Sequence, residues 1–169
     1  TNATIAGPLS LKQPALVKAD RGAEAAMNWL EQTANADVNS LNSSIPASGY
    51  YANYGNLNAS NVSLDDISDV KDDSTWTTYA FSAGQETDTQ NAINYIIERM
   101  CTTDGAAPES DATNKCQFGA AQAGGGSKQA KTAEQAGAKI EAGLSPVYRV
   151  TVRVTGPKNT QSYSQLYVY

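Results

Sequence analysis

The sequence predicts an α+β domain in which an N-terminal amphipathic helix packs on an antiparallel sheet of about four strands, with a disulfide-bounded region late in the chain. Three observations predict it: a helical apolar period over residues 10–35, alternation over residues 147–155 and again over 161–169, and the two cysteines, Cys101 and Cys116. A chain of 169 residues with 40% apolar content can bury one core. We therefore expect residues 1–169 to form a single globular domain.

The predicted helix begins near Ser10, a residue type that favours the N-cap position. Upstream, Gly7 and Pro8 predict a break or a first helical turn, and Pro14 would fall within the first turns, where its missing N–H matters little. The apolar side chains recur at steps of three and four residues, which predicts one buried face. This face is expected to pack either on the sheet or on another helix. Its main residues are Ala19, Ala23, Ala26, Met27 and Leu30.

Residues 35–74 are rich in Asn, Ser and Asp, and their apolar residues are scattered without a period. We expect an ordered loop with one helical turn near Leu64–Val70, and its length favours an exposed or functional surface. Its acidic side chains include Asp65, Asp66 and Asp69. They lack the alternating spacing and central glycine of an EF-hand loop, so we expect a solvated face rather than a calcium site.

The first two strands are expected at Trp76–Ala83 and Ala92–Met100, with a turn through Gly84–Asp88 between them. The first segment alternates apolar and polar residues, as a strand does. The second is ambiguous, because its isoleucines fit helical spacing as well as alternation. The preceding strand and the tight turn favour a second strand.

The C-terminal hairpin is the clearest signal in the chain. Over Val147–Thr155, β-branched and aromatic residues alternate with Arg149, Arg153 and threonines, which predicts a half-buried strand. Gly156–Thr160 supplies turn chemistry, and alternation resumes over Gln161–Tyr169. Because a lone hairpin is marginally stable in water, it must be covered and joined by further strands.

The two cysteines enclose fourteen polar, turn-forming residues. Without a CxxC spacing or a histidine, a metal site is disfavoured, and a disulfide formed in an oxidising compartment is expected. Two reduced thiols in a cytosolic protein are the alternative. The following residues 117–143 are rich in Ala, Gly, Lys and Gln, and Ser127–Ala142 could form a surface helix or a flexible loop.

Composition excludes several classes of function. The chain has no histidine, which removes the commonest general base and transition-metal ligand. The net charge of -5 argues against nucleic acid as a partner. We expect no enzymatic activity, no cofactor and no metal.

Three segments resemble one known family. SLKQPALVKADRGAEAAMNWL (Ser10–Leu30), INYIIERMC (Ile93–Cys101) and VYRVTVRVTGPKNTQSYSQLYVY (Val147–Tyr169) are similar to segments of PilX-type minor pilins of bacterial type IV pili. The resemblance implies a pilin fold, with a long helix across an antiparallel sheet, and it supports the strand interpretation of Ala92–Met100. It also implies that a cleaved leader and an apolar helical half precede Thr1 in the full protein.

The resemblance further implies a non-catalytic subunit that helps prime pilus assembly and acts at or near the pilus tip in adhesion. Its partners would be other minor pilins, the major pilin and a pilus-tip adhesin. The full-length protein would be anchored in the inner membrane, facing the periplasm, and would later enter the cell-surface pilus. The helix face named above would pack partly on neighbouring subunits. A docking surface between subunits is expected at Arg149, Arg153, Lys158, Asp65, Asp66 and Asp69.

Other functions fit the same pattern less fully. A minor pseudopilin of a type II secretion system shares the helix-on-sheet plan. A calcium- or carbohydrate-binding adhesion module would use Tyr50, Tyr51, Tyr54 and the aspartates as its surface. An aspartate-based hydrolase would need paired carboxylates, and none stand out beyond the expected solvated cluster.

Overall fold

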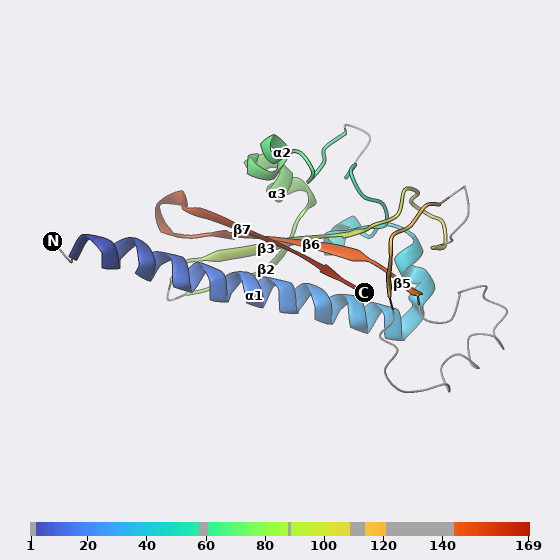
Figure 1. The fold of residues 1–169 in the computed structure, drawn as a ribbon, viewed down its shortest axis with the longest axis horizontal. Coiled ribbons are helices and arrows are strands. Elements are labelled where there is room, and N and C mark those ends of the chain that lie inside the picture. The colour runs from blue at the N-terminus through green and yellow to red at the C-terminus, as the bar shows by residue number, and fades with distance from the viewer. Residues whose placement is uncertain (1–2, 58–60, 88, 109–113, 121–143) are drawn as a thin grey trace.

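The computed structural model describes residues 3–57, 61–87, 89–108, 114–120 and 144–169. A long helix, α1 (Ala3–Asp37), lies along one face of a five-stranded sheet, and two short helices, α2 (Ile67–Lys71) and α3 (Asp73–Tyr79), lie over the opposite face (Figure 1). The chain is therefore α+β, with a helix, a sheet and an irregular third layer. The expected surface helix or loop at Ser127–Ala142 lies outside the described residues.

Helix α1 begins at Ala3, earlier than predicted, so Gly7, Pro8 and Pro14 all lie within it. Its buried sheet-facing residues are small apart from one leucine, and the half-buried Trp29 packs beside them on Tyr50. Four of the five residues predicted for this face are buried, namely Ala19, Ala23, Ala26 and Leu30. The fifth, Met27, is 39% exposed and lies outside this core.

Gly22 lies where the helix approaches the sheet most closely. A Cβ atom at this position would come within 2.5 Å of Val152 Cγ1 and 2.8 Å of Ile93 Cγ2. Those distances are too short for any side chain, so glycine is what allows the helix to lie directly on the two central strands.

The main sheet has the order β1-β3-β6-β7, and β2 pairs with the same side of β3 as β1 does. Strand β1 runs parallel to β3, while all the other pairs are antiparallel. The sheet is therefore mixed, and the predicted purely antiparallel sheet was wrong, because β1 is only two residues long and shows no alternation in the sequence. The five strands are β1 (Tyr50–Tyr51), β2 (Phe81–Gln85), β3 (Ala92–Arg99), β6 (Tyr148–Thr155) and β7 (Gln161–Val168).

Strands β3, β6 and β7 confirm the predicted strands at Ala92–Met100, Val147–Thr155 and Gln161–Tyr169. The predicted strand at Trp76–Ala83 was wrong in its first half, which is helix α3, and the predicted turn begins too early because β2 continues to Gln85. The Asp72 carboxylate accepts a hydrogen bond from the backbone N–H of Ser74 and caps α3. This local cap and the burial of Trp76 stabilise a helix where the alternation had predicted a strand.

Both faces of the central strands are buried. The face toward α1 belongs to a core that includes Tyr95, Val150 and Val152, while Ile96 on the other face joins a second core with Trp76 and Leu64. The prediction of a half-buried strand at Val147–Thr155 was therefore wrong. We call the third layer the cap and define it as residues 53–57 and 61–79. It covers the face of the sheet that was predicted to be exposed to solvent.

A disulfide joins Cys101, just after β3, to Cys116, just before β4 (Phe118–Ala120), and confirms the predicted pairing. Backbone hydrogen bonds from Thr102 N to Lys115 O and from Gln117 N to Met100 O flank it. Strand β4 pairs with β5 (Leu144–Pro146) to form a separate two-stranded sheet, and β5 leads directly into β6. The disulfide thus attaches this small sheet to the end of β3.

Candidate functional site

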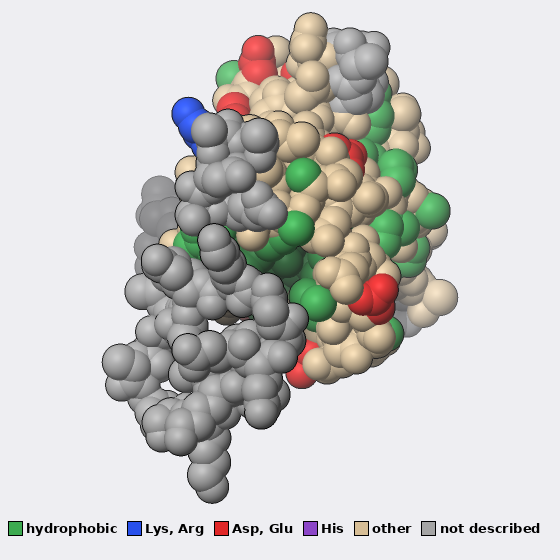
Figure 2. All heavy atoms as spheres, turned by 90° about the vertical axis from the view of Figure 1, so that its right-hand side faces the viewer, with side chains coloured by type: hydrophobic (Ala, Val, Ile, Leu, Met, Phe, Trp, Pro, Cys, Tyr) green, Lys and Arg blue, Asp and Glu red, His purple; other side chains and the backbone are tan. Residues whose placement is uncertain are grey.

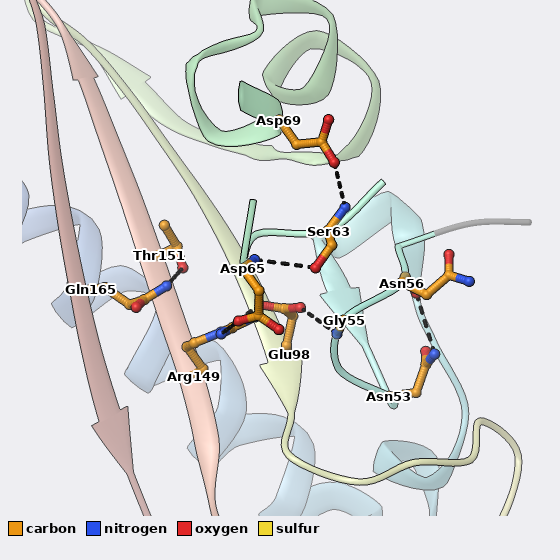
Figure 3. Close-up of polar contacts among 10 residues, drawn as sticks. All are labelled: Asn53, Gly55, Asn56, Ser63, Asp65, Asp69, Glu98, Arg149, Thr151 and Gln165. Carbon is orange, nitrogen blue, oxygen red and sulfur yellow. Dashed lines mark hydrogen bonds and ion pairs between the residues drawn. The ribbon is translucent and has the colours of Figure 1, made fainter. Parts of the chain in front are cut away.

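A cluster of buried charged side chains lies between the sheet and the cap. Glu98 and Arg149 are opposite each other in the register of β3 and β6. Arg149 Nε donates to Glu98 Oε2 at 2.8 Å, and Arg149 Nη2 lies 2.7 Å from the same oxygen (Figure 3). The side chains are 0% and 4% exposed, so this ion pair is inside the protein.

The cap supplies the other partners of this pair. Asp65 forms an ion pair and hydrogen bond with Arg149 Nη1, and the backbone N–H of Gly55 donates to Glu98 Oε1 at 3.4 Å (Figure 3). Asp65 is half-exposed, so it closes the pair from the solvent side. The carboxylate of Glu98 is therefore held from two directions, by the neighbouring strand and by the cap backbone.

Burial decides the electrostatics of the cluster. It raises the pKa of Glu98, and the neighbouring Arg149 guanidinium only partly opposes this rise. Burial also disfavours the charged form of Arg149, but the carboxylates of Glu98 and Asp65 outweigh it, so the pKa of Arg149 is raised. The arginine therefore stays charged, while the desolvation of Glu98 is incompletely compensated.

A second ion pair lies further along the same strand. Arg153 Nη1 donates to Asp73 Oδ1 at 2.8 Å, and Gln161 Nε2 donates to the same oxygen at 3.0 Å. The Arg153 guanidinium also lies over the Trp76 ring, 5.5 Å from its centroid, where a cation–π interaction is favourable. The cap is thus attached to β6 by an arginine at two points, Asp65 and Asp73.

The structure brings together the two oppositely charged segments that the sequence predicted for docking between subunits. Arg149 and Arg153 are buried under the cap, and Asp65 is the ion-pair partner of Arg149. The cap that encloses these arginines takes them out of an exposed docking surface and gives them partners within the chain.

The other predicted docking residues have separate positions. Asp66 caps α2 by accepting from Ser68 Oγ at 2.7 Å and from Ser68 N at 2.8 Å, and these two hydrogen bonds lower its pKa. Asp69 accepts from Ser63 N at 2.9 Å. Lys158 is exposed in the turn between β6 and β7. The aspartates therefore order the cap, and Lys158 remains available to a partner.

Arg99 is a structural residue that the sequence prediction missed. Its side chain is buried at the end of β3, where Nε donates to Ala52 O at 2.9 Å and Nη2 donates to Ala106 O at 2.8 Å. Nη1 donates to Asn42 Oδ1 at 3.2 Å. The available signal was an adjacent glutamate and arginine at the end of a strand rich in apolar residues, because buried charges require partners.

Several kinds of site are not seen in the described chain. Within the residues described, no cluster of three or more Asp, Glu or Cys side chains is placed to hold a metal ion. The end of the molecule drawn in Figure 2 shows scattered acidic side chains among apolar and uncharged ones. The described residues on this face therefore form no single charged patch.

Hydropathy and comparison with known proteins add two findings. None of the helices in the described ranges combines the length and the apolar character that crossing a membrane requires. Comparison of the chain with protein-family models, with curated proteins and with solved structures found no match.

Proposed function

We propose that this chain is the globular domain of a minor type IV pilin, a non-catalytic subunit that helps prime pilus assembly and acts at or near the pilus tip in adhesion. One observation carries the proposal. Helix α1, 35 residues long, lies with a narrow small-residue face on a sheet that ends in the C-terminal hairpin (Figure 1). That arrangement is what the resemblance of the helix, β3 and hairpin segments implies.

The opposite side of α1 supports a packing role. The residues on this side between positions 20 and 31 are exposed and mix charged residues with one methionine, which is a composition suited to contact with another polar helix. In the proposed role, this surface packs against other minor pilins and the major pilin. The exposed residues are Asp20, Arg21, Glu24, Met27, Asn28 and Glu31.

The cap supports a second contact, with a pilus-tip adhesin. Ion pairs and N-caps order its two short helices on the sheet, and Ile67 on α2 is 64% exposed. An ordered surface loses less conformational entropy on binding than a flexible one does. In this proposal the full-length protein is held in the inner membrane before it enters the pilus on the cell surface.

The test is a deletion of the gene in the source bacterium, with pili counted by electron microscopy and adhesion measured to a surface. We expect fewer pili and weaker adhesion, restored by the wild-type gene but not by a gene carrying Met27→Glu. Gln85→Glu, a matched charge at an exposed site of β2 that lies outside both proposed contact surfaces, should restore both. Unchanged pilus number and adhesion in the deletion strain would refute the role, and a defect in protein secretion alone would indicate a type II secretion pseudopilin.

A further inference from the structure

One edge of the main sheet is long, regular and open. Strand β7 has eight residues and pairs with β6 in eight successive partners without a register shift. Among the described residues, no strand pairs with its other side. A strand in this position presents a row of backbone N–H and C=O groups that can pair with another chain.

The opposite edge is built differently. Strand β1 has two residues, and β2 has five with a register shift between Ser82 and Gly84, where Gly84 has a φ of 117°. Short edge strands and bulges are the means by which sheets prevent pairing with other chains. The sheet thus protects one edge and leaves the other regular.

Strand β7 also lacks the side chains that protect an edge. Residues 161–168 include no charged residue and no proline, although charges and prolines on edge strands are the usual barriers to pairing. Tyr167 is 54% exposed, and Gln165 is also exposed. A neutral strand of this kind has no repulsion to overcome when it meets an identical one.

We propose that β7 is a homodimer interface, in which the β7 strands of two copies pair antiparallel about a two-fold axis at Gln165. This register keeps equivalent faces of the two sheets together, because opposed residues then have the same parity in the alternation. It places Tyr163 opposite Tyr167 of the second copy on the cap face. On the helix face, it places Ser164 opposite Leu166 and Ser162 opposite Val168.

The second copy fits this edge better than a charged peptide does. The Tyr163–Tyr167 pair occurs twice in the dimer, and cross-strand aromatic pairs stabilise sheets. No like charges come together along the paired strands, and the two sheets become one continuous sheet. This inference stands on the edge geometry and does not rest on the pilin proposal.

The decisive experiment uses charge at position 165 of the full 169-residue chain. Sedimentation velocity over increasing concentration should show a monomer–dimer equilibrium for the wild type. Gln165→Lys and Gln165→Glu each place like charges opposite each other and should raise the dimer dissociation constant roughly fivefold or more. An equal mixture of the two variants should dimerise at least as tightly as the wild type, because each lysine then faces a glutamate.

The control is Ser82→Lys, which adds the same charge to the exposed, bulged edge strand and should leave dimerisation unchanged. An independent variant is Gln165→Cys, whose opposed Cβ atoms would be close enough to form an intermolecular disulfide, whereas Ser82→Cys should not cross-link. A wild type that stays monomeric at all concentrations, or a Gln165→Cys chain that does not cross-link, would overturn the proposal. Failure of Gln165→Lys and Gln165→Glu to dimerise when they are mixed would also overturn the proposal.

Discussion

Glu98 and Arg149 face each other on neighbouring strands, and both side chains are buried. Asp65 and Gly55 approach the pair from the cap, so one buried ion pair links the two central strands to a segment distant in sequence. Both charges have lost their water, so partners from the chain must replace it, and Arg149 Nη2 has no hydrogen-bond partner among the described residues. The cap and the sheet therefore depend on each other for stability.

Removing one member of the pair should be costly. We expect Glu98→Ala to lower the free energy of unfolding by about 3 kcal/mol, since Arg149 would lose its buried partner. Urea denaturation followed by circular dichroism measures this change. Asp65→Ala should cost less, because Asp65 is half-exposed and water can replace it.

Removing both members should be tolerated. The double variant Glu98→Met with Arg149→Met replaces the pair by apolar side chains of similar length and should recover most of the stability lost in Glu98→Ala. The raised pKa of Glu98 supports this expectation, because it indicates that the pair does not fully offset the burial of the carboxylate. A double variant less stable than either single variant would show that the ion pair itself is strongly stabilising.

The same raised pKa predicts a pH dependence. An acid whose pKa is higher in the folded than in the unfolded protein binds more protons when folded, so its contribution to stability falls as pH rises above its ordinary value of 4.5 and through its folded value. The stability of the wild type relative to Glu98→Gln should therefore decrease as pH rises through that window. Urea denaturation of both proteins at a series of pH values measures this difference, and a flat or rising difference would contradict it.

The sequence predicts the part of the fold that depends on local periodicity. The alternation around Val150 and Val152 correctly places one face of β6 in the core against α1, and the spacing of Ala19, Ala23 and Ala26 identifies the helix face that covers it. These patterns are visible because each one is repeated within a single element.

The cap could not be predicted in the same way, because its contacts join residues far apart in the chain. Asp65 and Arg149 each look like ordinary surface charges in the sequence, and their pairing depends on a loop path that no local pattern specifies. Strand β1 is too short to alternate, and the alternation that begins at Trp76 predicted a strand where the chain forms α3. A glutamate and an arginine adjacent in β3 were the available sign of a buried polar layer.

Arg99 should be irreplaceable by lysine. Its guanidinium donates to carbonyl groups of three segments, at Asn42, Ala52 and Ala106, and a lysine ammonium cannot match that planar arrangement. We expect Arg99→Lys to destabilise the chain and to increase proteolytic cleavage within residues 102–108. Limited proteolysis with mass spectrometry would detect this. Lys115→Arg, at an exposed site, is the matched control and should leave the cleavage pattern unchanged.

The helix–sheet contact at Gly22 gives the sharpest test of the packing. Gly22→Ala should raise helix propensity by about 1 kcal/mol, yet its new Cβ would meet Val152 Cγ1 at 2.5 Å and force the helix away from the sheet. Because overpacking of this kind costs roughly 1–3 kcal/mol, we expect net destabilisation in thermal and urea denaturation. Asn28→Ala, on the exposed side of the same helix, gains propensity without a clash and should be neutral or stabilising. If Gly22→Ala were stabilised as much as Asn28→Ala, the close approach of α1 to β3 and β6 would be refuted.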